Sequence, residues 1–154
     1  MFKLCLMILS IISPAVAAAQ TAPPPAPPEE VFSPDAAGRV LHAFREALIT
    51  QDRARTLALF DSARMPGYAE FADSLGVLFQ QNSQKYLSVR VGFHLLQTND
   101  ETGAALVDFT LEALPVRGEE PPLRHRDQLR FTFARAGKKW KIIDVQPRSF
   151  FAGF

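Results

Sequence analysis

Cysteine is almost absent from this 154-residue chain, and its scarcity removes several kinds of chemistry. The single cysteine, Cys5, lies in an N-terminal apolar segment that we expect to be removed. The mature chain would then have no disulfide and no thiolate nucleophile. The three histidines show no metal-ligand spacing, so we expect no metal site and no cofactor. A phosphate-cradling glycine loop and a nucleophile elbow are also missing.

Positive and negative charges are nearly balanced, so the net charge indicates little about a binding partner. The formal net charge is +1, yet the region from Arg124 onward holds eight Lys and Arg against two Asp. Such a basic end can meet an anionic surface, or it can be an ordinary solvated sheet face. Because dense basic runs and exposed aromatic platforms are missing, we favour the solvated face and expect no nucleic-acid binding.

The N-terminus has the form of a secretory signal peptide. Lys3 supplies a positive start, Leu4 to Ile12 is an apolar run, and small residues precede Gln20. The run is too short to span a bilayer comfortably. We therefore expect a signal peptide at 1–19, cleaved after Ala19, a secreted or periplasmic location, and no membrane span in the mature protein. An uncleaved N-terminal anchor is the alternative.

A proline-rich segment follows the predicted signal peptide. Thr21 to Glu30 reads TAPPPAPPEE, a composition that favours extended polyproline II geometry and cannot pack a core. We expect a disordered tether at 20–32 and one folded domain at 33–154. At 47% hydrophobic residues, with 13 phenylalanines, the chain can bury a core without disulfides or bound metals to stabilise it.

Three amphipathic helices are predicted in the first half of the domain. Ser33-Pro34-Asp35 combines a capping hydroxyl, a proline at the first helical position and an acid in the first turn. Apolar residues then recur at spacings of three and four up to about Ile49. Asp52 can cap a second, shorter helix that carries Phe60, and a third helix is predicted at roughly 68–80. These helices need a sheet to cover their apolar faces.

The second half of the domain predicts that sheet. Apolar and polar residues alternate over 89–95, 105–111 and 129–133, as in half-buried strands. Ala136 to Lys139 is a glycine-containing turn, and Trp140 to Val145 is the fourth strand. Three helices followed by an antiparallel meander indicate an α+β fold.

In this order of elements the chain resembles the nuclear-transport-factor-2-like superfamily, which includes SnoaL-like and ketosteroid-isomerase-like proteins. The resemblance covers Ser33 to Phe151 and rests on the long first helix, the short Asp52–Phe60 helix and Gly137–Ile142 before the closing strand. It implies a cystatin-like cone, in which three helices pack on a curved four-stranded antiparallel sheet around a cavity. Members include isomerases, dehydratases, carriers and non-catalytic oligomeric domains, so the fold does not settle the function.

Enzymes of this superfamily place an acid/base pair in the cavity. The alternation of side chains along each strand predicts which candidate residues face that cavity. His94 and Asp108 are out of phase with the apolar faces of their strands, so we expect both to be solvated. His125 and Asp127 share the parity of Leu129, which suits a base and its orienting partner. They are the candidate catalytic pair, unless they lie in the loop or at the open end of the strand, where the core face meets water.

The resemblance also implies candidates for ligand binding on the inner surfaces of the cone. Tyr68 could supply a hydroxyl to the cavity, although a buried tyrosine with one hydrogen bond is the more frequent case. The other candidates are the apolar residues Phe71, Phe131, Phe133 and Trp140.

These observations predict an exported domain that is not an enzyme. We expect it to bind a small apolar molecule in the cone, or to form a homodimer through the outer face of the sheet. The alternatives are an isomerase-like or dehydratase-like enzyme that uses His125 and Asp127, and a protein-interaction module of the cell envelope. Convergence of His125, Asp127 and Tyr68 in a closed cavity would favour the enzyme. A cone filled by phenylalanine side chains would count against both pocket hypotheses.

Overall fold

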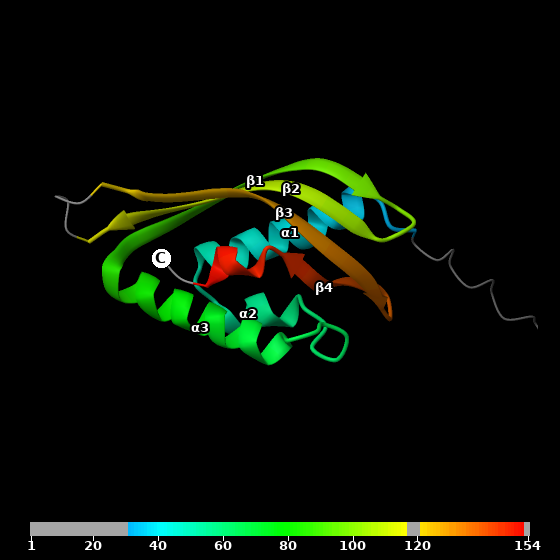
Figure 1. The fold of residues 1–154 in the computed structure, drawn as a ribbon, viewed down its shortest axis with the longest axis horizontal. Helices are drawn as coiled ribbons and strands as arrows, with labels where there is room; N and C mark the ends of the chain where they lie inside the picture. The colour runs from blue at the N-terminus through cyan, green and yellow to red at the C-terminus, as the bar shows by residue number, and fades with distance from the viewer. Residues whose placement is uncertain (1–30, 117–120, 153–154) are drawn as a thin grey trace, which may run out of the picture.

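Three helices lie on one side of a curved four-stranded sheet (Figure 1). The computed structural model describes residues 31–116 and 121–152, so the predicted signal peptide and residues 20–30 of the predicted tether lie outside the described residues. The elements are α1 (Pro34–Ile49), α2 (Arg53–Ala58), α3 (Tyr68–Lys85), β1 (Tyr86–Asn99), β2 (Ala104–Pro115), β3 (Leu123–Ala136), β4 (Lys139–Gln146) and the 3-10 helix η1 (Arg148–Phe151). The α+β class predicted from the sequence is confirmed. Within the described ranges, every helix is too short or too polar to cross a membrane.

The predicted capping residues begin the first two helices. The Ser33 hydroxyl accepts a hydrogen bond from the backbone N–H of Ala36, and the Asp52 carboxylate accepts one from Arg55. Each bond satisfies a backbone donor that has no partner within its helix. The third helix is longer than predicted, because it continues to Lys85 and leads directly into β1.

The sheet is an antiparallel meander in the order β1-β2-β3-β4, as predicted. In β4 the register shifts by one residue. Phe133 pairs with Ile142, whereas the preceding Thr132 pairs with Asp144, so Ile143 is the extra residue of a bulge. The edge of β4 that does not pair with β3 is covered at Ile142. Phe60 forms a parallel bridge to Ile142, and the backbone N–H of Asp61 donates a hydrogen bond to the carbonyl of Ile142. This contact protects an edge that could otherwise pair with another chain.

The core lies between the helices and the inner face of the sheet. The buried side chains of β2 and β3 follow the predicted alternation, with Val107, Phe109, Leu129 and Phe131 fully buried. The sequence prediction did not include η1. It returns the chain to the core, and both Phe150 and Phe151 are buried.

The packed part of the chain begins at Phe32, one residue before the predicted start of the domain. Its ring is 3% exposed and contacts the rings of Phe133 and Trp140, at centroid distances of 5.2 and 5.1 Å. The last residue of the predicted tether therefore belongs to the packed structure.

Candidate functional site: the interior of the cone and the outer face of the sheet

Phenylalanine rings occupy the interior of the cone, where the resemblance implies a cavity. All of these rings are buried, and their centroids lie 4.8 to 6.3 Å apart in consecutive contacts, which is the spacing of packed aromatic pairs. They come from every layer of the fold and are Phe44, Phe60, Phe71, Phe109, Phe131, Phe150 and Phe151. The phenylalanines that could have lined a cavity instead pack against one another.

Phe151 of η1 joins the layers of this cluster. Its ring is 0% exposed and lies 5.8 Å from both Phe44 of α1 and Phe71 of α3, and 6.1 Å from Phe109 of β2. Phe150 packs beside it at 5.0 Å. The role of these two residues in filling the cone was not predicted from the sequence. Their only signal was a pair of adjacent phenylalanines beyond Pro147, which the strand pattern does not explain.

His125, a candidate catalytic residue, lies against this filling. Its half-buried imidazole is 4.4 Å from the ring of Phe150, at an interplanar angle of 40°. In register it pairs with Leu111, whose side chain is buried, so it occupies the inner face as parity predicts. The surface of the imidazole that faces Phe150 is covered by a side chain of the protein.

Asp127, the proposed partner of His125, is exposed. It pairs with the buried Phe109, yet its Oδ1 accepts a hydrogen bond from the adjacent backbone N–H of Gln128, at 2.8 Å. The reason is its place in the sheet, because β4 pairs with β3 only from Arg130 onward. Asp127 therefore lies on an uncovered strand edge, where the inner face meets water.

Tyr68 and Phe71 lie at the beginning of α3, and η1 separates them from His125. Tyr68 is half-buried and packs against the core. From Phe71 the aromatic contacts run through Phe151 and Phe150 before they reach His125. Phe71 also lines a surface hollow of about 230 Å³ together with Arg148.

The other apolar candidates are divided between the core and the surface. Phe131 and Phe133 are buried and stack at 6.3 Å. Trp140 is half-buried and lines a groove beside α1. Its indole Nε1 is buried without a hydrogen-bond partner among the described residues.

The outer face of the sheet bears polar and charged side chains and is covered by no helix among the described residues (Figure 1). By register this outer face comprises residues of three adjacent strands, namely Arg90, Gly92, His94, Leu106, Asp108, Thr110, Glu112, Arg124, Arg126, Gln128 and Arg130. Two of its ion pairs cross from β2 to β3. Arg124 is 3.6 Å from Glu112, and Arg126 pairs with Asp108. His94 and Asp108 belong to this solvated face, as the sequence predicts.

The Arg126 guanidinium alters the ionisation of Asp108. Its hydrogen bonds to the Asp108 carboxyl are the largest influence, and they lower the pKa of that group. Partial burial raises the pKa, and electrostatic interactions with Arg126 and His94 lower it further. Because the pKa in the folded protein is lowered, the pair stabilises the fold above the ordinary carboxyl pKa of about 4. That contribution is lost as the pH falls through the lowered pKa.

Replacing Arg126 with glutamine is expected to raise the pKa of Asp108 toward its ordinary value, because the dominant hydrogen-bond donor is removed. Carboxyl-detected NMR titration of the two proteins measures this change. Asp61 provides the internal control, since its own lowered pKa depends on Arg64 and should be unchanged. Arg64→Gln should produce the reverse pattern. An Asp108 pKa that does not respond to Arg126→Gln would contradict the ion pair.

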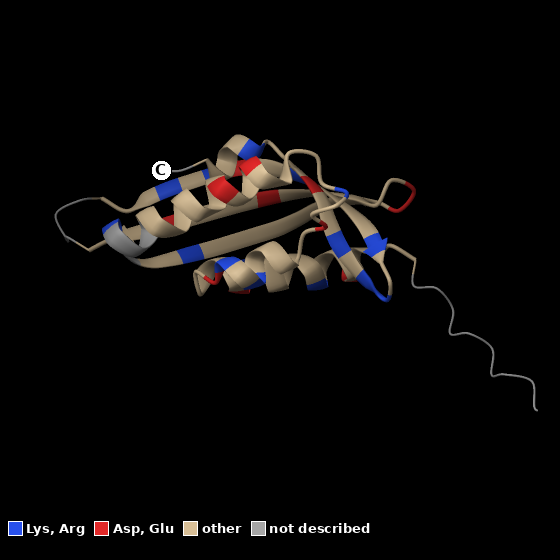
Figure 2. Cartoon of the chain, turned by 90° about the horizontal axis from the view of Figure 1, so that it is seen from below, with Lys and Arg blue, Asp and Glu red and all other residues tan. Residues whose placement is uncertain are grey.

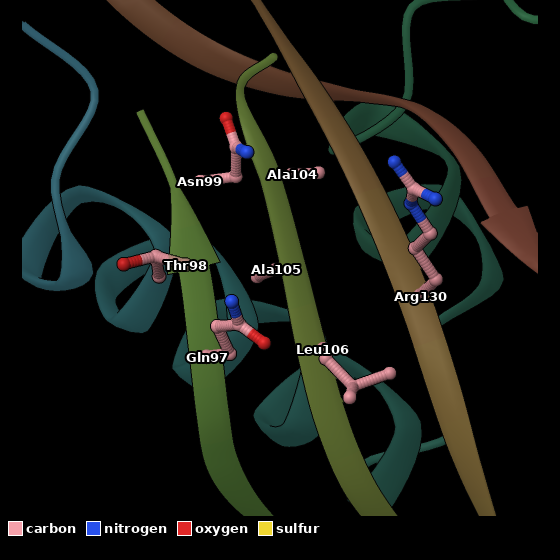
Figure 3. Close-up of a pocket in the computed structure, with 7 residues that line it drawn as sticks. All are labelled: Gln97, Thr98, Asn99, Ala104, Ala105, Leu106 and Arg130. Carbon is pink, nitrogen blue, oxygen red and sulfur yellow. The ribbon is translucent and has the colours of Figure 1, made fainter. Parts of the chain in front are cut away.

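A shallow hollow of about 250 Å³ lies at one end of the sheet. Gln97, Leu106 and Arg130 line it from three adjacent strands, as Figure 3 shows. Its apolar lining residues are Ala104, Ala105 and Leu106. Across residues 31–116 and 121–152, no group of three His, Cys, Asp or Glu residues could hold a metal ion.

Comparison with solved structures identifies the fold. A conserved protein of Planctomyces limnophilus is 16% identical, with a TM-score of 0.57, over 71% of this chain and 90% of that one. A proposed scytalone dehydratase of Novosphingobium aromaticivorans is 13% identical, with a TM-score of 0.54, over 72% and 79%. A proposed dehydratase of the nuclear-transport-factor-2-like family from Streptomyces avermitilis is 19% identical, with a TM-score of 0.50, over 72% and 91%.

The chain therefore has the nuclear-transport-factor-2-like fold, as the sequence resemblance predicts. The sequence matches no family model and no curated protein. At identities below 20%, these structural similarities establish the fold, and the function must be argued from this chain's own residues.

Proposed function

We propose that this protein is an exported, non-catalytic domain that forms a homodimer through the outer face of its sheet. The observation that carries this proposal is the filled interior. The space that would hold a substrate or an apolar ligand is occupied by the side chains of Phe150, Phe151 and the rings packed around them. Among the described residues, no helix covers the outer face of the sheet (Figure 1).

The composition of the outer face suits a protein interface. Arginine is enriched at interfaces, and the acids of β2 are already paired with arginines of β3, which reduces the number of unpaired charges that association would bury. Near its centre, Gly92 pairs with Thr110, and nothing lies within 4 Å of the position that a Cβ at Gly92 would occupy. A second copy could therefore approach the backbone closely at this point.

The enzyme alternative requires a rearrangement. An isomerase or dehydratase that used His125 and Asp127 would have to displace Phe150 from the imidazole, and it would rely on a carboxylate that is exposed. A small apolar ligand in the cone would have to displace the same rings. For these reasons the packing favours association over both pocket hypotheses.

The test is the mass of the mature protein in solution, measured by light scattering and by native mass spectrometry over a range of concentrations. We expect a dimer whose subunit begins at Gln20, which also tests signal cleavage. Gly92→Lys should raise the dimer dissociation constant about 100-fold or more, because two cations would be buried without partners.

Gly38→Lys is the matched control for that variant. Gly38 lies on α1, and nothing lies within 4 Å of the position that its Cβ would occupy, so lysine adds the same charge and bulk away from the outer face. It should leave the dissociation constant unchanged. A monomer at high concentration, or equal effects of the two lysines, would contradict the proposal. A subunit that retains residues 1–19 would contradict export by a cleaved signal.

A further inference from the structure

A groove beside α1 combines an apolar floor with a basic rim. The groove has a volume of about 240 Å³ and lies between α1, the residue after α2 and the turn that joins β3 to β4. The ribbon at this turn carries the blue of Lys and Arg positions in Figure 2. The described lining includes the apolar side chains of Val40, Leu59 and Trp140 and the cationic side chains of Arg39, Lys138 and Lys139.

The groove is separate from the interior of the cone. Trp140 pairs with Arg135 at the end of the β3–β4 hairpin, and its ring packs on Phe32. Val40 and Leu59 are partly buried and pack against the core from the outside. The groove thus needs no movement of Phe150 or Phe151 to be occupied.

The charges of the groove indicate the kind of ligand. Among the described residues that line it, three side chains are cationic and none is acidic, whereas the hollow beside Arg148 contains Glu70 as well. Lys138 and Lys139 are adjacent and exposed at the turn. Ammonium and guanidinium groups form charge-assisted hydrogen bonds with carboxylates, and these bonds are stronger than bonds between neutral groups.

The size of the groove limits that ligand. Pockets for drug-sized molecules are usually about 300–1,000 Å³, so a groove of about 240 Å³ suits a smaller molecule. A short apolar chain can lie along Val40, Leu59 and Trp140, with its charged end at the two lysines. Burial of the chain removes apolar surface from water on both partners.

We propose that this groove binds a small amphipathic carboxylate, with the carboxylate at Lys138 and Lys139 and the apolar part against Trp140. Arg39 lies on the same rim. The proposed site is independent of the dimer, because its residues are not part of the outer face.

Octanoate is a suitable probe, and Trp140 reports on it directly because it is the only tryptophan in the chain. We expect a saturable change in Trp140 fluorescence and in the NMR signal of its indole N–H, with half-saturation below about 10 mM for a ligand of this size. Neutral 1-octanol should bind about tenfold more weakly, because a charge-assisted hydrogen bond is lost. Octylammonium should not bind.

The lysines of the domain provide a matched pair of double variants. Lys138→Ala with Lys139→Ala should raise the octanoate dissociation constant at least about tenfold. Lys85→Ala with Lys141→Ala removes the same charge outside the groove lining and should change it less than about twofold. Equal effects of the two double variants, equal affinity for octanol, or no saturable change would each overturn the proposal.

Discussion

Replacing Phe151 with alanine is expected to lower the free energy of unfolding by about 3–5 kcal/mol. The ring is fully buried and contacts phenylalanines of α1, α3 and β2, so its removal leaves a cavity at the point where these elements meet. Because the contacting elements are held by their own backbone bonds, they can close that space only partly. The melting temperature should fall by roughly 10–20 °C.

Denaturant unfolding of the two proteins measures this effect. Ser149→Ala serves as the control, since Ser149 belongs to the same 3-10 helix but is exposed. It should change the free energy of unfolding by less than about 0.5 kcal/mol. A loss below about 1 kcal/mol for Phe151→Ala would mean that η1 is not packed in the cone.

The same variant also tests whether the cone is filled in the native protein. An apolar cavity of suitable size binds small apolar molecules such as benzene, and binding to the folded state raises its stability. Benzene should therefore raise the melting temperature of Phe151→Ala and leave the native protein unchanged. Equal stabilisation of both proteins would show that the native interior already has room, and it would restore the ligand-binding hypothesis.

Replacing Gly103 with alanine is expected to lower the free energy of unfolding by about 3 kcal/mol. Gly103 has a φ of +60°, and a Cβ there would lie 2.7 Å from the backbone oxygen of Phe133. The left-handed conformation alone costs a residue other than glycine about 1–2 kcal/mol. The steric overlap adds to this cost, because the carbonyl of Gly103 also accepts a hydrogen bond from Phe133 N–H, and neither backbone segment can move without disturbing that bond.

Gly137→Ala separates the two contributions. Gly137 has a φ of +63°, but nothing lies within 4 Å of its Cβ position. Alanine there should cost only the conformational term of about 1–2 kcal/mol. Thermal and denaturant unfolding of both variants give the comparison. If Gly103→Ala cost no more than Gly137→Ala, the close approach between the β1–β2 loop and β3 would be wrong.

The sequence by itself determined the features that depend on neighbouring residues. Ser33 and Asp52 cap their helices because a short polar side chain can reach backbone N–H groups two or three residues ahead. The alternation around Phe109 and Phe131 determined which side chains face the core and placed Asp108 on the solvated face, since successive strand residues point to opposite sides. Together these local rules predicted the order of the elements and the α+β fold.

Strand parity also placed His125 on the inner face, but it could not show that Asp127 is exposed. That exposure depends on where β4 stops pairing with β3, at Arg130, and the extent of a strand pair is not encoded in one strand. The groove beside Trp140 escaped prediction for a related reason. Its cations come from the β3–β4 turn and from α1, which are about a hundred residues apart in the chain.

Only the tertiary structure decided whether the cone is open or filled. Side chains from α1, α3, β2, β3 and η1 occupy the interior. A cavity remains only if their summed volume is smaller than the space between these elements. The sequence contains 13 phenylalanines but does not specify which of them share one space. The return of Phe150 and Phe151 through η1 fills that space, and it moves the proposed function from the interior of the cone to its surfaces.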